Sequence, residues 1–94
     1  MSKTVVVQLG NSDNKLTQAE WSEFVSYVRD AIGESSINIH FDGGSRYDAP
    51  WQNACFVSEV CDEHLAQLKS DLECYRKMYR QDSVAVTIGD TLFV

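Results

Sequence analysis

The chain has 94 residues and a mass of 10.6 kDa, so we expect one domain over residues 1–94. Its 44% hydrophobic and 23% charged residues are typical of a globular protein and argue against a disordered or fibrous one. Its 14 acidic and 8 basic residues give a formal net charge of -6, which disfavours direct nucleic-acid binding because cations must neutralise the phosphates.

The first half of the chain predicts a strand, a helix and a second strand. Residues 4–9 are rich in β-branched side chains, which is typical of a strand. Thr17 and Glu20 have the spacing of a capping box at a helix N-terminus, and Gly33 is suited to end that helix. Residues 36–42 alternate between apolar and polar side chains, which predicts the second strand.

The second half predicts a strand, a helix and a last strand. Residues 54–60 form the third strand, and a second helix begins at Asp62 with an apolar stripe at helical spacing. Residues 83–88 form the fourth strand. The turn signal Gly89-Asp90 then leaves room for a short fifth strand at residues 91–94.

The order β-α-β-β-α-β is that of a ferredoxin-like α+β fold. We therefore expect an antiparallel sheet with two helices on one face and a short extra strand at the C-terminus. The other face of such a sheet is uncovered. Because many unrelated proteins share this arrangement, the fold alone does not indicate an activity.

Alternation along the strands predicts which side chains lie on the uncovered face. We expect the polar set of the second strand and one set of the third to lie there: Asn38, His40, Asp42, Cys55 and Glu59. We expect the helices to cover the other sets: Ile37, Ile39, Phe41, Ala54, Phe56, Ser58 and Val60. A histidine near a carboxylate and a thiol has the groups for acid–base or nucleophilic chemistry. Polar residues on a solvated sheet face, however, need no function.

The connection between the second and third strands, residues 43–53, is long for a hairpin. It carries Arg46, Tyr47 and Trp51, and these residue types are frequent in binding hot spots. The competing interpretation is structural: the aromatic rings fold back on the core and Arg46 pairs with a nearby carboxylate. The candidate binding residues from this loop and the strand before it are His40, Asp42, Arg46, Tyr47, Trp51 and Asn53.

The cysteines and the N-terminus bear on location and metal content. Three cysteines cannot pair fully within one chain, which favours reduced thiols and a cytoplasmic location. The N-terminal apolar run is too short for a signal sequence, and no stretch has the length of a membrane span. Cys61 and His64 have the spacing of a metal pair but no second pair accompanies them, so we expect no metal and no cofactor.

We favour a small interaction or regulatory domain that binds a protein partner over an enzyme. No strong catalytic motif accompanies the acidic charge and the aromatic loop. The apolar C-terminal residues Leu92, Phe93 and Val94 also predict a homodimer, formed through a sheet edge or through the uncovered face.

Two alternatives remain open from the sequence. The first is a cofactor-free enzyme or ligand-binding protein, which would resemble the dimeric α+β barrels in size and expected architecture. In such proteins two open sheet faces close over a pocket, and His40, Tyr47, Trp51 and Asn53 are residue types that these pockets use. The second is an acidic protein that occupies the nucleic-acid-binding surface of another protein.

Overall fold

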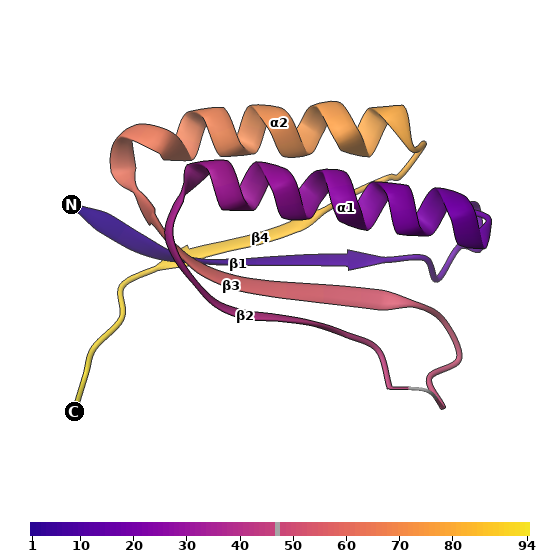
Figure 1. Cartoon of the computed structure of the whole chain (residues 1–94), viewed down its shortest axis with the longest axis horizontal. Coiled ribbons are helices and arrows are strands. Elements are labelled where there is room, and N and C mark those ends of the chain that lie inside the picture. The colour runs from indigo at the N-terminus through magenta and orange to yellow at the C-terminus, as the bar shows by residue number, and fades with distance from the viewer. Residues whose placement is uncertain (47) are drawn as a thin grey trace.

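The fold consists of a four-stranded sheet and two helices, seen in a computed structural model that describes residues 1–46 and 48–94. The elements are β1 (Ser2–Gly10), α1 (Gln18–Ser35), β2 (Ser36–Gly44), β3 (Asn53–Cys61), a 3-10 turn (Asp62–His64), α2 (Leu65–Met78) and β4 (Ala85–Gly89). All neighbouring strands are antiparallel, in the order β2-β3-β1-β4. Both helices lie side by side over the same face of the sheet (Figure 1). The expected α+β class, antiparallel sheet and two helices are therefore confirmed.

Some element boundaries differ from those expected. Helix α1 runs past Gly33, which keeps a negative φ, and the Ser36 N–H still donates to the Ile32 carbonyl. Residues 62–64 form a 3-10 turn, so α2 begins only at Leu65. The prediction of a fifth strand at residues 91–94 is wrong, because β4 ends at Gly89 and residues 90–94 form no strand.

The centre of the sheet is held by one side of β1 and one side of β3. In β1, Val5, Val7 and Leu9 are at most 4% exposed, whereas the residues between them face away from the helices. In β3 the helix side carries Ala54, Phe56, Ser58 and Val60, all of them buried as expected. The helices supply the opposite half of the core with Trp21, Phe24, Val28, Ala31, Ile32, Leu68 and Leu72. Each fully buried aliphatic side chain contributes about 2 kcal/mol relative to an exposed one.

Strand β2 is an edge strand, and its pairing with β3 is irregular at two points. The register shifts between Ser36 and Asn38 and again between Ile39 and Phe41. Each shift marks a bulge, in which two residues oppose one on the partner strand. The bulges change which side chains share a face, and no residue of β2 is buried.

The capping box at the start of α1 has the expected geometry. The Glu20 N–H donates to Thr17 Oγ1 at 3.2 Å, and the Thr17 N–H donates to Glu20 Oε1 at 3.1 Å. Both donors would otherwise be unpaired at the start of α1. The cap therefore fixes where the helix begins.

We predict that Thr17→Ala lowers the free energy of unfolding by about 1 kcal/mol, because the Glu20 N–H loses its acceptor. Urea denaturation followed by circular dichroism measures the change. Ser22→Ala, at an exposed position of α1, is the control and should change stability by less than about 0.5 kcal/mol. Equal effects of the two substitutions would contradict a capping role.

Tyr79, just beyond α2, packs its ring beside Phe24, with ring centroids 5.3 Å apart. Its hydroxyl donates to Glu23 Oε2 of α1 at 3.1 Å. Burial of the ring, together with this hydrogen bond to a carboxylate, raises the pKa of Tyr79 to about 12. The phenol is thus held neutral well above the pH at which an unfolded tyrosine ionises.

We predict that Tyr79 makes the fold sensitive to alkali. The unfolded chain releases the Tyr79 proton near its ordinary pKa of 10.0 and the folded chain only near 12. The contribution of Tyr79 to the free energy of unfolding is therefore fully present below pH 10 and is lost as the pH rises to about 12. Tyr79→Phe should reduce this alkaline decline, measured by urea denaturation at several pH values. Tyr27→Phe, at an exposed ring, should retain it.

Candidate functional site

The sheet has one face that no helix covers. We call it the open face and define it from the strand register by Thr4, Val6, Gln8, Asn38, His40, Phe41, Cys55, Val57, Glu59, Ala85 and Thr87. Residues directly opposite each other on paired strands point to the same side, so these side chains form one surface. Asn38, His40, Cys55 and Glu59 lie on it as expected.

The bulges of β2 overturn two expectations about this face. Phe41 opposes Val57 and therefore lies on the open face, not against the helices. Asp42 opposes the buried Phe56 and therefore lies on the helix side. Ile39 opposes the buried Ser58 and so lies on the helix side as expected. The helices do not bury this edge, however, since Ile37 and Ile39 are 53% and 45% exposed.

Apolar side chains occupy the middle of the open face. Phe41 is 52% exposed, and Val57 lies opposite it on β3. Val6 lies opposite Val57 on the next strand, so the three side chains cross the sheet in one row. The Phe41 ring lies over Gly43, where a Cβ atom would overlap it. The row thus forms a continuous apolar strip on a face that also carries polar side chains.

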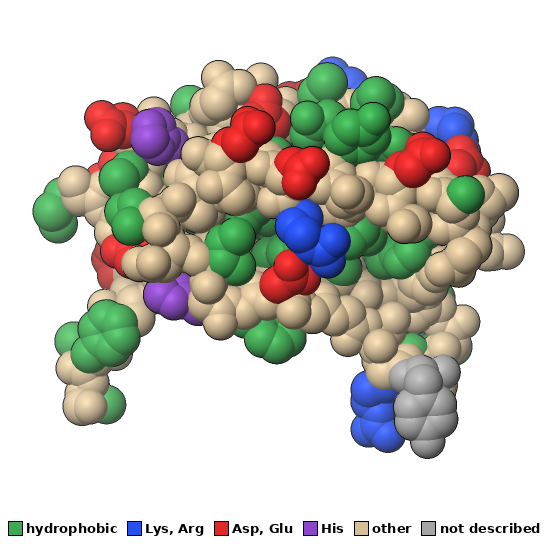
Figure 2. All heavy atoms as spheres, viewed as in Figure 1, with side chains coloured by type: hydrophobic (Ala, Val, Ile, Leu, Met, Phe, Trp, Pro, Cys, Tyr) green, Lys and Arg blue, Asp and Glu red, His purple; other side chains and the backbone are tan. Residues whose placement is uncertain are grey.

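The open face is hollowed between two projections (Figure 2). The C-terminal residues 90–94 project beneath one end of the sheet, and the loop between β2 and β3 projects beneath the other (Figure 1). The tail begins at an ion pair, in which Lys3 Nζ donates to Asp90 Oδ1 at 2.8 Å. This hydrogen bond and the charge of Asp90 raise the pKa of Lys3. The Thr91 hydroxyl then contacts the Thr4 hydroxyl.

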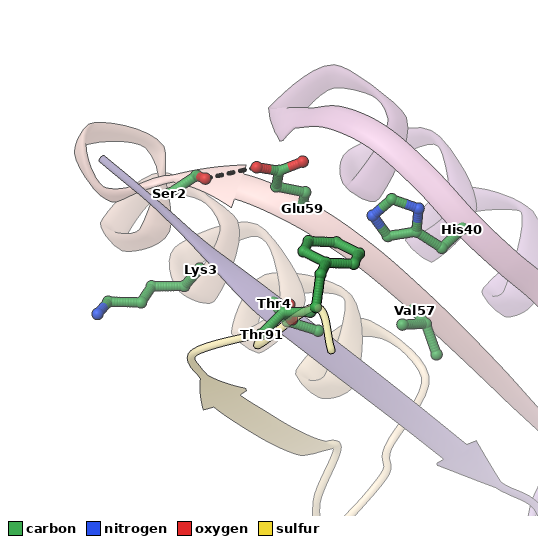
Figure 3. A pocket seen from close by; sticks show the side chains of 8 residues that line it. Ser2, Lys3, Thr4, His40, Val57, Glu59 and Thr91 are labelled. Carbon is green, nitrogen blue, oxygen red and sulfur yellow. Dashed lines mark hydrogen bonds between the residues drawn. The ribbon is translucent and has the colours of Figure 1, made fainter.

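A pocket of about 320 Å³ lies on the open face beside this tail (Figure 3). Its lining combines hydroxyl, titratable and apolar groups from three strands and the tail: Ser2, Thr4, His40, Val57, Glu59 and Phe93. The Ser2 hydroxyl donates to Glu59 Oε2 at 2.6 Å, and the His40 imidazole projects into the same hollow (Figure 3). A bound molecule would therefore meet an apolar wall, a carboxylate and an imidazole together.

The pocket has some of the groups for acid–base chemistry but not a complete arrangement. A general base is commonly oriented by a third group. Among residues 1–46 and 48–94, no hydrogen bond joins His40 to Glu59 or fixes the imidazole. In the same part of the chain, no group of three His, Cys, Asp or Glu residues could hold a metal ion. No described helix is long and apolar enough to cross a bilayer.

Of the loop residues singled out from the sequence, Arg46, Trp51 and Asn53 lie toward the other end of the sheet. Glu59 opposes Thr4 near the start of β1, whereas Asn53 opposes Gly10 at its end. Six residues along β3 separate the two positions, roughly 20 Å of strand. Because His40 lines the pocket together with Glu59, the structure does not bring it together with Arg46, Trp51 and Asn53 as one site.

Within the described part of the loop, two side chains have clear environments. Arg46 donates to both carboxylate oxygens of Asp48, at 3.1 and 3.2 Å. Trp51 is 51% exposed and does not plug the core. The Asn53 backbone closes the loop, because Asn53 N–H donates to Ser45 Oγ and its carbonyl accepts from Ser45 N–H. Tyr47 lies outside the described residues.

Several residues of the pocket were not singled out from the sequence. Ser2, Thr4 and Val57 belong to the open sides of β1 and β3, and the alternation of these strands was the available signal. Phe93 was noted for its apolar character, but nothing in the sequence placed it beside His40. A comparison with protein-family models finds no match, and a comparison with curated proteins finds none either.

Asp42 has a structural partner where a binding role had been expected. Arg29 of α1 donates to its two carboxylate oxygens at 2.7 and 3.1 Å. The same guanidinium lies 5.6 Å from the centre of the Phe56 ring. The pair therefore joins α1 to the edge strand and partly covers Phe56.

We predict a double-mutant-cycle coupling of under about 1 kcal/mol between Arg29 and Asp42, because both groups are partly solvated. Arg29→Ala should cost more than Asp42→Ala, since it also removes contact with Phe56. Urea denaturation of the two single variants and the double variant measures this. An Asp42→Ala variant of unchanged stability that loses a binding activity would instead assign Asp42 to the site.

Proposed function

We propose that this protein is a non-enzymatic interaction domain that binds a protein partner through the open face. The observation that carries the proposal is the uncovered apolar strip of Phe41, Val57 and Val6. A contiguous apolar patch with a polar surround is typical of a protein-binding surface. Aromatic residues near the middle of a patch are also frequent binding hot spots.

The proposal includes the finer assignment of the fold. The element order β-α-β-β-α-β and the strand order β2-β3-β1-β4 support a ferredoxin-like arrangement. The helices of this arrangement cover the buried side of β1 and β3 and leave the opposite side for binding. The net charge of -6 supports a protein partner over nucleic acid. The three free cysteines support a reducing, cytoplasmic setting.

A second candidate function is binding or conversion of a small molecule in the pocket. The observation that favours it is the convergence of His40 and Glu59 on one hollow of about 320 Å³, a volume that suits a small ligand. The dimeric α+β barrel type, in which a second sheet closes the open face, would enclose such a pocket. His40 and Glu59 would then be the acid–base groups.

We predict that Phe41→Lys abolishes partner binding and leaves the fold intact, because Phe41 is already half exposed. The immobilised protein is exposed to an extract of the cells that produce it, and the retained proteins are compared between variants. Met78→Lys is the matched control, since Met78 is 56% exposed on α2, away from the open face.

Proteins retained by the wild type and by Met78→Lys, and lost with Phe41→Lys, would support the open face. Retention of the same proteins by all three would contradict it. The second candidate function has a different signature. A small molecule would raise the melting temperature of the wild type and of Met78→Lys, and His40→Ala would abolish the increase.

A further inference from the structure

We propose that the partner of the open face is a second copy of this chain, related by a two-fold axis. This inference rests on the proposed function, because it names the occupant of the same surface. Three features of the face favour a second copy: its low charge, its chemical self-complementarity and its area.

The distribution of charge favours this face for self-association. A chain of net charge -6 repels its own copy over most orientations. The open face as defined carries a single carboxylate, Glu59, of the 14 acidic residues in the chain. The acidic side chains visible in Figure 2 lie mainly over the helices and along the flank of the molecule. Two copies that meet through their open faces therefore keep most of their like charges apart.

The face is also chemically self-complementary. In a two-fold interface the same patch of each copy forms both sides of the contact, so the patch must be complementary to itself. The apolar strip of Phe41, Val57 and Val6 meets this condition, because apolar rows pack equally well against themselves. The imidazole of His40 and the carboxylate of Glu59 line the pocket beside this strip.

The sheet face supplies part of the area that a stable dimer needs, and the tail supplies more. Four strands about 4.8 Å apart and up to nine residues long give a face on the order of 500 Å² in projection. A standard interface buries about 800 Å² of each partner. The tail supplies more apolar surface at one end of the face, since Leu92, Phe93 and Val94 are each at least 84% exposed. In the dimer these residues lie at the rim and contact the other copy.

Sedimentation equilibrium at high micromolar concentration tests the inference. The wild type is expected at twice the 10.6 kDa mass of one chain. Val57→Lys is expected to weaken the dimer roughly a hundredfold or more and to sediment as a monomer at this concentration, because each interface would bury two unpaired ammonium groups. Met78→Lys on α2 adds the same charge outside the open face and should remain dimeric. Circular dichroism checks that each variant is folded, and Phe41→Lys replaces Val57→Lys if the latter unfolds.

A mixing experiment tests the two-fold relation directly. Val57→Lys and Val57→Asp should each be monomeric alone, and their mixture should recover a dimer because the opposite charges face each other across the axis. A monomeric wild type, or a dimer that both open-face variants leave intact, would overturn the inference. Those results are distinguishable from failure of the proposed function, which is judged separately by whether Phe41→Lys loses the proteins retained from the extract.

Discussion

Coverage of the sheet on one side only is the constraint on which the rest of the structure depends. Two helices can bury one side of β1 and β3, and the hydrophobic core is built entirely on that side. The period of two along each strand then assigns every second residue to the opposite side. Thr4, Val6 and Gln8 face away from the helices because Val5, Val7 and Leu9 face them and are buried. The core and the candidate binding surface are therefore two consequences of one pattern.

The open face differs from an ordinary solvated sheet face in its middle and in its charge. Phe41 and Val57 occupy positions where an isolated protein would gain solubility from polar side chains. The carboxylates that give the chain its charge of -6 are placed mostly elsewhere, and Asp42 lies on the helix side, where it pairs with Arg29. The pocket beside the tail adds His40 and Glu59 at one end of the same face. These features together give the face a composition suited to contact with another molecule.

The parts of the fold that depend on local pattern could be predicted from the sequence. The capping box of Thr17 and Glu20 is a contact between neighbours, and the faces of β3 follow from strict alternation. The faces of β2 after His40 could not be predicted, because its bulges are set by how it pairs with β3 and leave no mark in residues 36–42. One bulge is enough to exchange the faces of Phe41 and Asp42.

The candidate site also combines features that local sequence pattern predicts with features that only the folded chain determines. His40 was placed correctly on the uncovered face, but the long loop after its strand carried Arg46 and Trp51 to the far end of the sheet. The path of the C-terminal tail could not be predicted from the sequence either. Gly89-Asp90 is a sequence typical of a hairpin turn, but the chain does not return along β4. Instead Asp90 pairs with Lys3 and Thr91 contacts Thr4, both near the start of β1.

The irregular edge strand has a consequence for how copies of this chain can assemble. A regular sheet edge is a template on which further strands add without limit, and such growth leads to fibres. Here the two bulges of β2 interrupt the ladder on one edge, and β4 offers only five residues on the other. Neither edge presents a long, even row of backbone groups. Open-ended growth by strand addition is thereby obstructed at both edges of the sheet.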